Sequence, residues 1–171
     1  MTKAQQLYLK IASFTFNHSN KFRIWLYKKA GMRIGESCFI NKFFTTTNNI
    51  QIGNHCYLNR FCRFVGVAHD GKVIIGNNVF IAFGVNFCLA THELGRKTQR
   101  AGMYYNRDIE VGDGTWICTN VTILPGVKIG KGCVIAAGSV VNKDCEDNYL
   151  YGGVPAKQIK KLLDDETFLC E

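Results

Sequence analysis

The chain has 171 residues, enough for one domain with its own core. It carries 21 Lys and Arg residues against 13 Asp and Glu residues, a net charge of +8, but no nucleic-acid-binding motif, so we do not expect DNA or RNA as its partner. No apolar run reaches the ~18 residues of a membrane span, and the N-terminus lacks a signal-peptide pattern, so we expect a cytoplasmic protein.

Residues 1–33 are predicted to be a helical cap. Leu7, Ile11 and Phe14 recur at helical spacing within residues 3–14. Residues 21–33 mix aromatic and basic side chains, which allows two interpretations. They either cover the strand edges of the segment that follows or bind loosely to a membrane surface. We favour the cap, because a repeat domain needs covered ends.

A six-residue repeat occupies residues 34–152. In its clearest run every block opens with Val or Ile, and the blocks begin at Val111, Ile117, Ile123, Ile129 and Ile135. The same phase begins earlier at Ile34, Ile52 and Ile75. No α-helix repeats every six residues, whereas each side of a parallel β-helix can do so and point its first residue inward. The repeat therefore predicts an all-β solenoid, a parallel β-helix.

Five of the eight cysteines share the fifth position of a six-residue block: Cys38, Cys56, Cys62, Cys133 and Cys145. Small residues such as Ser, Thr, Ala and Val would also fit this position, and a free Cys packs as a small hydrophobe. The chain has no CxxC pair, which argues against a structural zinc site. We predict that these cysteines pack in the core and that the protein requires no metal.

The repeat is interrupted by residues 93–108, a segment rich in Arg, Lys and Tyr. A break of this length inside a compact domain is usually functional, so we predict a projecting loop. His92 comes directly before it, and imidazole can accept a proton near neutral pH, which makes His92 a candidate general base. Residues 153–171 are predicted to form a short helix, from Pro155 to about Leu163, and a tail.

These blocks resemble the left-handed β-helix acyltransferases over about four fifths of the chain. The most specific pieces are Ile81-Ala82 followed by His92, the run from Val111 to Lys143, and the segment Tyr151–Ala156. Within that family the chain looks most like the galactoside, maltose and capsular-sugar O-acetyltransferases. The resemblance implies a homotrimer, with acetyl-coenzyme A between neighbouring β-helices. The phosphates of coenzyme A would suit the basic chain.

The resemblance also implies site residues. It places His92 as general base, and it lines the acceptor site with Asn59, Asp70, Met103 and Tyr104. The coenzyme contacts that it implies are Thr119, Ala137, Asn142, Lys143, Lys157 and Lys160. Two departures stand out: Cys118 replaces a usual Gly, and lysines replace arginines at 157 and 160, keeping the charge but losing bidentate geometry.

The function that these features predict is direct transfer of acetyl from acetyl-coenzyme A to a saccharide hydroxyl. Three alternative functions are weighed against this one. An antibiotic or amino-sugar acetyltransferase of the same fold is the main alternative, and a non-catalytic binding protein is a weaker one. A γ-type carbonic anhydrase needs three zinc-binding histidines, and only His69 and His92 are candidates here.

Overall fold

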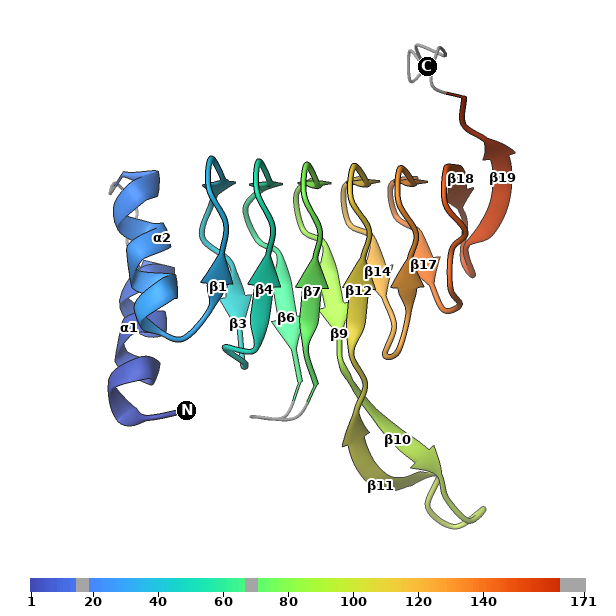
Figure 1. The fold of residues 1–171 in the computed structure, drawn as a ribbon. Coiled ribbons are helices and arrows are strands. Elements are labelled where there is room, and N and C mark those ends of the chain that lie inside the picture. The colour runs from blue at the N-terminus through green and yellow to red at the C-terminus, as the bar shows by residue number, and fades with distance from the viewer. Residues whose placement is uncertain (15–18, 67–70, 164–171) are drawn as a thin grey trace.

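The computed structural model describes residues 1–14, 19–66 and 71–163. Two helices come first, α1 (Lys3–Phe14) and α2 (Asn20–Lys29), and short strands follow. Successive strands enter three sheets in turn, and we call one passage through sheets A, B and C a coil. Figure 1 shows the coils stacked in a row, with the helices at one end and the C-terminal strands at the other.

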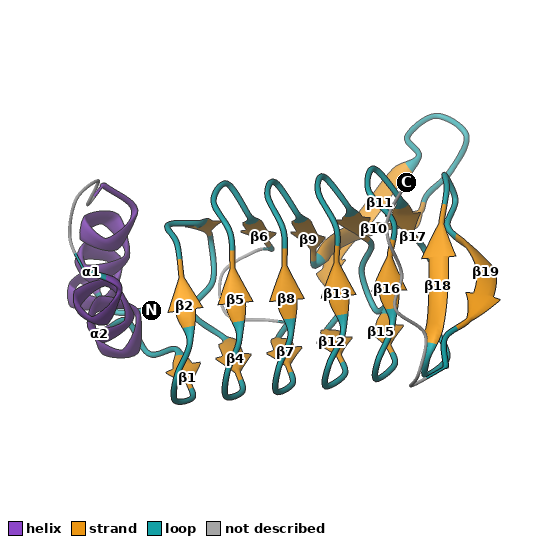
Figure 2. Cartoon of the chain, turned by 90° about the horizontal axis from the view of Figure 1, so that it is seen from above, coloured by secondary structure: helices purple, strands orange, loops and turns teal. Residues whose placement is uncertain are grey.

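Each sheet pairs equivalent strands of successive coils, and sheet B ends in one additional antiparallel strand. Sheet A contains β1 (Arg33–Ile34), β4 (Ile50–Ile52), β7 (Val73–Ile75), β12 (Ile109–Val111) and β15 (Lys128–Ile129). Sheet B contains β2 (Phe39–Ile40), β5 (Tyr57–Leu58), β8 (Phe80–Ile81), β13 (Trp116–Ile117), β16 (Val134–Ile135), β18 (Tyr149–Gly152) and β19 (Lys157–Lys161), and Figure 2 shows it face-on. Sheet C contains β3 (Phe44–Thr45), β6 (Arg63–Val65), β9 (Asn86–Cys88), β14 (Thr122–Ile123) and β17 (Val140–Val141).

The core lies between the three sheets and consists of aligned aliphatic and aromatic rows. All five residues that open the blocks of the clearest run are buried. In sheet B the inward row is fully buried and comprises Ile40, Leu58, Ile81, Ile117 and Ile135. In sheet C the rings of Phe64 and Phe87 stack with centroids 4.5 Å apart. The six-residue period thus records which residue of each side points inward, as predicted.

Asn and Asp side chains link the coils at the corner between sheets A and B, the A–B corner. The backbone N–H of Asn54 donates to Asn77 Oδ1 at 2.9 Å, and the N–H of Asn77 donates to Asp113 Oδ1 at 2.7 Å. The coils approach so closely here that a Cβ on Gly112 would lie 2.6 Å from the backbone of Gly130. Only glycine fits that contact, which explains the Gly in the second position of many blocks.

The five cysteines predicted to pack are buried, and their thiols are free. Burial raises the pKa of Cys56 and Cys62 to about 11 and that of Cys145 to about 12. A thiol must lose its proton to act as a nucleophile, so these side chains remain neutral near pH 7. The packing prediction is confirmed for them.

The helix α2 covers the free edge of the first coil. The side-chain amide of Asn20 donates to the carbonyl of Cys38 and its oxygen accepts from the N–H of Ile40, both at 2.8 Å. Asn20 thereby pairs with β2 as a neighbouring strand would, which hides a sheet edge. The Tyr27 ring stacks on Phe43 at 4.4 Å and its hydroxyl accepts from the Phe43 N–H.

The helix α1 packs on α2 with a different face from the one that its apolar spacing suggested. Leu9 and Ala12 are buried, whereas Leu7 is 57% exposed and Ile11 is 39% exposed. The Phe14 side chain lies outside the described residues. A short helix against another helix needs only a narrow buried stripe, so its remaining apolar residues face solvent. None of the described helices is long and apolar enough to cross a membrane.

The predicted helix from Pro155 to about Leu163 is wrong. Residues 157–161 form β19, which pairs antiparallel with β18 in the register Gly152↔Lys157 and Leu150↔Lys160. β18 is the last parallel strand of sheet B and would present an open edge, so the returning strand satisfies its backbone groups. The hydrogen bonds gained with β18 outweigh the helical propensity of the lysine-rich segment.

Candidate active site

An antiparallel arm leaves the corner between sheets C and A, the C–A corner. Its strands are β10 (Ala90–Leu94) and β11 (Ala101–Asn106), and it projects away from the stacked coils (Figure 1). We expected an irregular loop over residues 93–108, but only residues 95–100 lie between the two strands. Pairing satisfies the backbone groups of a segment that reaches beyond the sheets.

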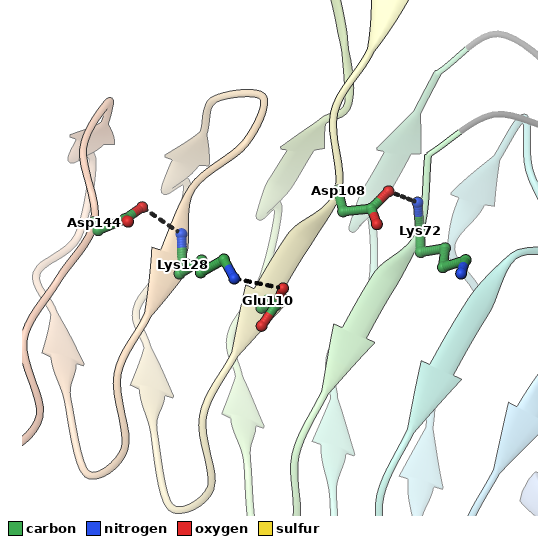
Figure 3. Close-up of polar contacts among 5 residues, drawn as sticks. All are labelled: Lys72, Asp108, Glu110, Lys128 and Asp144. Carbon is green, nitrogen blue, oxygen red and sulfur yellow. Dashed lines mark hydrogen bonds and ion pairs between the residues drawn. The ribbon is translucent and has the colours of Figure 1, made fainter.

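Backbone and carboxylate contacts fix the base of the arm. The N–H of Arg107 donates to the carbonyl of the buried Leu89 at 2.9 Å, which closes the ribbon where it leaves the coil. Asp108 Oδ1 accepts from the Lys72 N–H at 2.7 Å. Figure 3 shows this contact beside two others along sheet A, an ion pair of Lys128 with Glu110 at 3.1 Å and a hydrogen bond from the Lys128 N–H to Asp144.

His92 is held on the arm in one tautomer. Its Nδ1 lies 2.9 Å from the carbonyl oxygen of Gly102 on the opposite strand. A carbonyl oxygen can only accept, so Nδ1 carries the proton in this contact, and in the neutral ring Nε2 keeps its lone pair. The side chain is exposed. The arm therefore presents a proton acceptor to solvent, which is the geometry that a general base needs.

Met103 and Tyr104 lie on the same arm. Tyr104 pairs with His92 across the ribbon, and their rings meet edge-to-face with centroids 5.2 Å apart. Met103 is 72% exposed. The structure thus groups three of the predicted site residues on one projecting element. Asp70, another predicted acceptor contact, lies outside the described residues.

Asn59, Thr119 and Ala137 all fall on the corner between sheets B and C, the B–C corner. Thr119 and Ala137 are in adjacent coils, and the Thr119 carbonyl accepts from the N–H of Gly138 at 2.9 Å. Asn59 occupies the corner position that Cys118 occupies two coils further on, because each follows the equivalent inward residue of sheet B. The Cys118 side chain is partly exposed and precedes Thr119 at the same B–C corner.

The remaining predicted coenzyme contacts are divided between two places. Asn142 and Lys143 follow β17 and lie at the C–A corner, with both side chains exposed. Lys157 and Lys160 lie on β19 at the C-terminal edge of sheet B, also exposed.

The predicted site residues do not meet within one chain. The arm that carries His92 leaves the C–A corner, which is opposite sheet B in a three-sided coil. The two views agree, since the arm points down in Figure 1 and lies behind sheet B when the chain is seen from above in Figure 2. Thr119 and Ala137 are therefore separated from His92 by the whole of sheet C.

Sequence reasoning missed an aromatic row on the outer face of sheet B. The row comprises Phe39, Tyr57, Phe80 and Trp116, in register on neighbouring strands. The Tyr57 and Phe80 rings stack at 4.5 Å, and Phe80 remains 44% exposed. The signal was present in the sequence, because each aromatic residue comes directly before an inward aliphatic residue and must point outward.

The B–C corner can accommodate an extended ligand arm. A Cβ placed on Gly138 would find nothing within 4 Å, and the neighbouring Ala137 is exposed. A surface with such small side chains lets an extended chain approach the backbone closely. Among the described residues there is no group of three or more His, Cys, Asp and Glu side chains that could hold a metal ion.

Parallel coils with a six-residue period, an arm with an exposed His and a corner of small side chains define a transferase of the hexapeptide-repeat type. Comparison with known proteins agrees. The family model described as bacterial transferase hexapeptide (six repeats) matches residues 108–143. The galactoside O-acetyltransferase of Escherichia coli K12 is 34% identical over 162 residues, which cover 91% of this chain and 78% of that protein. The chain belongs to the hexapeptide-repeat acetyltransferases.

Two further comparisons show the extent of the similarity. A solved structure described as galactoside acetyltransferase in complex with coenzyme A matches with a TM-score of 0.83 and 29% identity, covering 94% of this chain and 80% of that one. A putative acetyltransferase of Schizosaccharomyces pombe is 45% identical over 101 residues, but the match covers only 47% of that longer relative and 59% of this chain.

Proposed function

We propose that this protein transfers an acetyl group from acetyl-coenzyme A to a hydroxyl of a saccharide. The observation that carries the proposal is the contact of His92 Nδ1 with the Gly102 carbonyl at 2.9 Å, which leaves Nε2 as a proton acceptor. Family membership supports the acetyl donor, since a galactoside acetyltransferase of similar fold binds coenzyme A.

In the proposed reaction His92 Nε2 accepts the proton of the acceptor hydroxyl as its oxygen attacks the acetyl carbonyl. The Gly102 carbonyl stabilises the imidazolium that forms, because it continues to accept from Nδ1–H. The backbone N–H of Thr119 donates to the oxygen that becomes negative. His92 then returns its proton to the departing thiolate, so direct transfer needs no nucleophilic side chain.

The coenzyme would lie along the corners of the coils. The small side chains around Ala137 leave room for its extended arm. The exposed Asn142 and Lys143 would contact it further along, and Lys157 and Lys160 on β19 would attract its phosphates. Cys118, beside Thr119, adds a side chain at the position where the resemblance implies a Gly.

A saccharide acceptor fits the polar and aromatic groups near these corners. The outward edges of the stacked Tyr57 and Phe80 rings, with Trp116 on the next strand, offer apolar surface for a sugar ring. The side-chain amide of Asn59 can donate and accept, as sugar hydroxyls require, and Asp70 would add a carboxylate acceptor. Met103 and Tyr104 would form the wall beside His92.

The proposed assembly is a homotrimer of left-handed parallel β-helices: the six-residue repeat predicts the parallel β-helix, and the resemblance to the family implies its left hand and the trimer. His92 and the B–C corner are on different sides of one chain. A cyclic arrangement would bring the arm of one protomer to the B–C corner and sheet B of the next, and it would build three equivalent sites.

A screen of saccharide acceptors tests this function. Purified protein is incubated with acetyl-coenzyme A and free, nucleotide-linked or lipid-linked sugars, and release of the coenzyme thiol is followed. We expect release that depends on a saccharide, and a product with one added acetyl group that hydroxylamine removes as an ester. A product that resists hydroxylamine would identify amine acetylation and reject the hydroxyl acceptor. Absence of thiol release with every saccharide would reject the proposal.

A further inference from the structure

The positive charge of this protein is concentrated in the helical cap. Seven of the 21 Lys and Arg residues, and none of the 13 Asp and Glu residues, lie within residues 1–33. The rest of the chain has 14 basic and 13 acidic residues, so its net charge is only +1. Coenzyme phosphates cannot account for this distribution, because the lysines proposed to bind them are at the other end of the coils.

The cap also exposes large apolar side chains. Leu7 and Ile11 of α1 are the outward residues described above, and on α2 Trp25 is 47% exposed and Phe22 is 38% exposed. Single exposed apolar residues are common on protein surfaces, but contiguous ones are not. The Phe22 and Trp25 rings stack at 5.8 Å, and Tyr8 of α1 meets Trp25 edge-to-face at 6.1 Å. Ile11 is three residues from Tyr8 and four from Leu7, so these side chains are neighbours on α1, and Tyr8 connects them to Trp25 and Phe22 of α2.

Lysines surround this surface on α2. Leu26, Tyr27 and Ala30 are buried against the coils, which turns Trp25 to the opposite side of the helix. On a helix, residues three and four apart are neighbours, so Lys21, Lys28 and Lys29 flank Trp25, and all three are exposed. The Lys29 ammonium lies 5.8 Å from the Trp25 ring. We call the exposed side chains of Leu7, Ile11, Phe22, Trp25, Lys21, Lys28 and Lys29 the cap patch.

We propose that the cap patch binds the surface of an anionic lipid bilayer. An interfacial helix has this character: aromatic and aliphatic side chains enter the headgroup region while lysines beside them contact anionic headgroups. Tryptophan favours this interface in particular, since its ring is apolar and its N–H is polar. Apolar residues would add nothing to the binding of a hydrophilic polyanion, so the combination favours a bilayer.

Vesicle binding tests the inference without any need for catalysis. The full protein is sedimented with phosphatidylcholine vesicles that contain phosphatidylglycerol, and with vesicles of phosphatidylcholine alone. Binding is expected only to the former. The chain has two tryptophans, so Trp116→Phe leaves Trp25 as the sole reporter, and its emission should shift to shorter wavelength as the ring leaves water. Soluble polyglutamate, which offers charge without an apolar interior, should produce no such shift.

Two charge-matched double variants complete the test. Lys28→Gln with Lys29→Gln should weaken vesicle binding by at least about tenfold, since each basic residue near an anionic bilayer contributes roughly fivefold. Lys131→Gln with Lys161→Gln removes the same charge from exposed sites far from the cap and should change binding little. Circular dichroism checks that both remain folded. Equal weakening by the two variants, a polyglutamate-induced shift, or no binding to anionic vesicles would each overturn the inference.

Discussion

The tautomer of His92 determines its chemistry, and one backbone contact determines the tautomer. Replacing His92 with Asn keeps a side chain that can donate to Gly102 but removes the basic nitrogen. We expect His92→Asn to lower kcat by about 10²–10⁴-fold, the usual contribution of a general base, with little change in acetyl-coenzyme A affinity. Steady-state kinetics and calorimetry measure both effects.

His55 provides the control for this substitution. It is an exposed histidine at the A–B corner with a φ of 56°, and Asn78 adopts nearly the same φ at the equivalent corner of the next coil. His55→Asn should therefore fold normally and keep its full rate. A folded His92→Asn enzyme with near-normal kcat would contradict the proposed mechanism, whereas an equal loss in both variants would indicate a general effect of histidine replacement.

The buried thiol of Cys62 should make stability depend on alkaline pH. Burial raises the pKa of this thiol from 9.0 to about 11. Below the unfolded pKa the thiol is protonated in both states, and the stability is fully present. Above it the unfolded chain releases the proton first, so unfolding becomes easier as pH rises toward 11, by about 1–3 kcal/mol in total for two pKa units. Urea unfolding at a series of pH values measures this slope.

Cys62→Val isolates the contribution of this thiol, because Val85 and Val121 occupy the same position in the next two coils and are fully buried. The variant should lose less stability between neutral and alkaline pH than the parent protein, although the other buried thiols still contribute. An identical slope in both proteins would show that the Cys62 thiol titrates alike when folded and unfolded.

At the scale of the coil, substitutions of two corner glycines should distinguish a glycine that is needed for lack of space from one that only adopts a positive φ. Gly112→Ala would place a Cβ 2.6 Å from the Gly130 backbone, which cannot move without separating two coils. We expect a loss of about 1–3 kcal/mol in unfolding free energy, as for other overpacked sites. Gly114→Asn is the control, since Gly114 has a φ of 68° but no close neighbour, and Asn78 tolerates the equivalent conformation. It should stay within about 0.5 kcal/mol of the parent. A larger loss at Gly114 than at Gly112 would contradict this explanation.

The elements predicted well are those whose pattern repeats. Ile117, Ile123 and Ile129 each mark an inward position, so the sequence alone predicts strands and their stacking. β19 and the arm were missed because their antiparallel pairing depends on the neighbouring strand, which no local period records. Likewise the spacing of Leu7 and Ile11 predicts a helix but does not specify which of its faces packs on α2. In the candidate site, residues could be proposed from motif spacing. The tautomer of His92 could not be predicted, because it depends on a contact with Gly102 across the two strands of the arm.

At the scale of the whole molecule, the separation of His92 from the B–C corner is the reason for proposing sites that are shared between protomers. A mixing experiment tests this directly. His92→Asn removes the proposed base from one side of the chain, and Ala137→Trp blocks the proposed coenzyme site at the B–C corner on another. Each variant alone should be inactive. When equal amounts are unfolded together and refolded, about one quarter of the interfaces in a cyclic trimer should combine an arm that carries His92 with a B–C corner that carries Ala137. Activity should therefore return to roughly that fraction of the refolded parent. A mixture that remains inactive, although light scattering shows a trimer and the parent regains its rate, would place both groups in the same protomer's site.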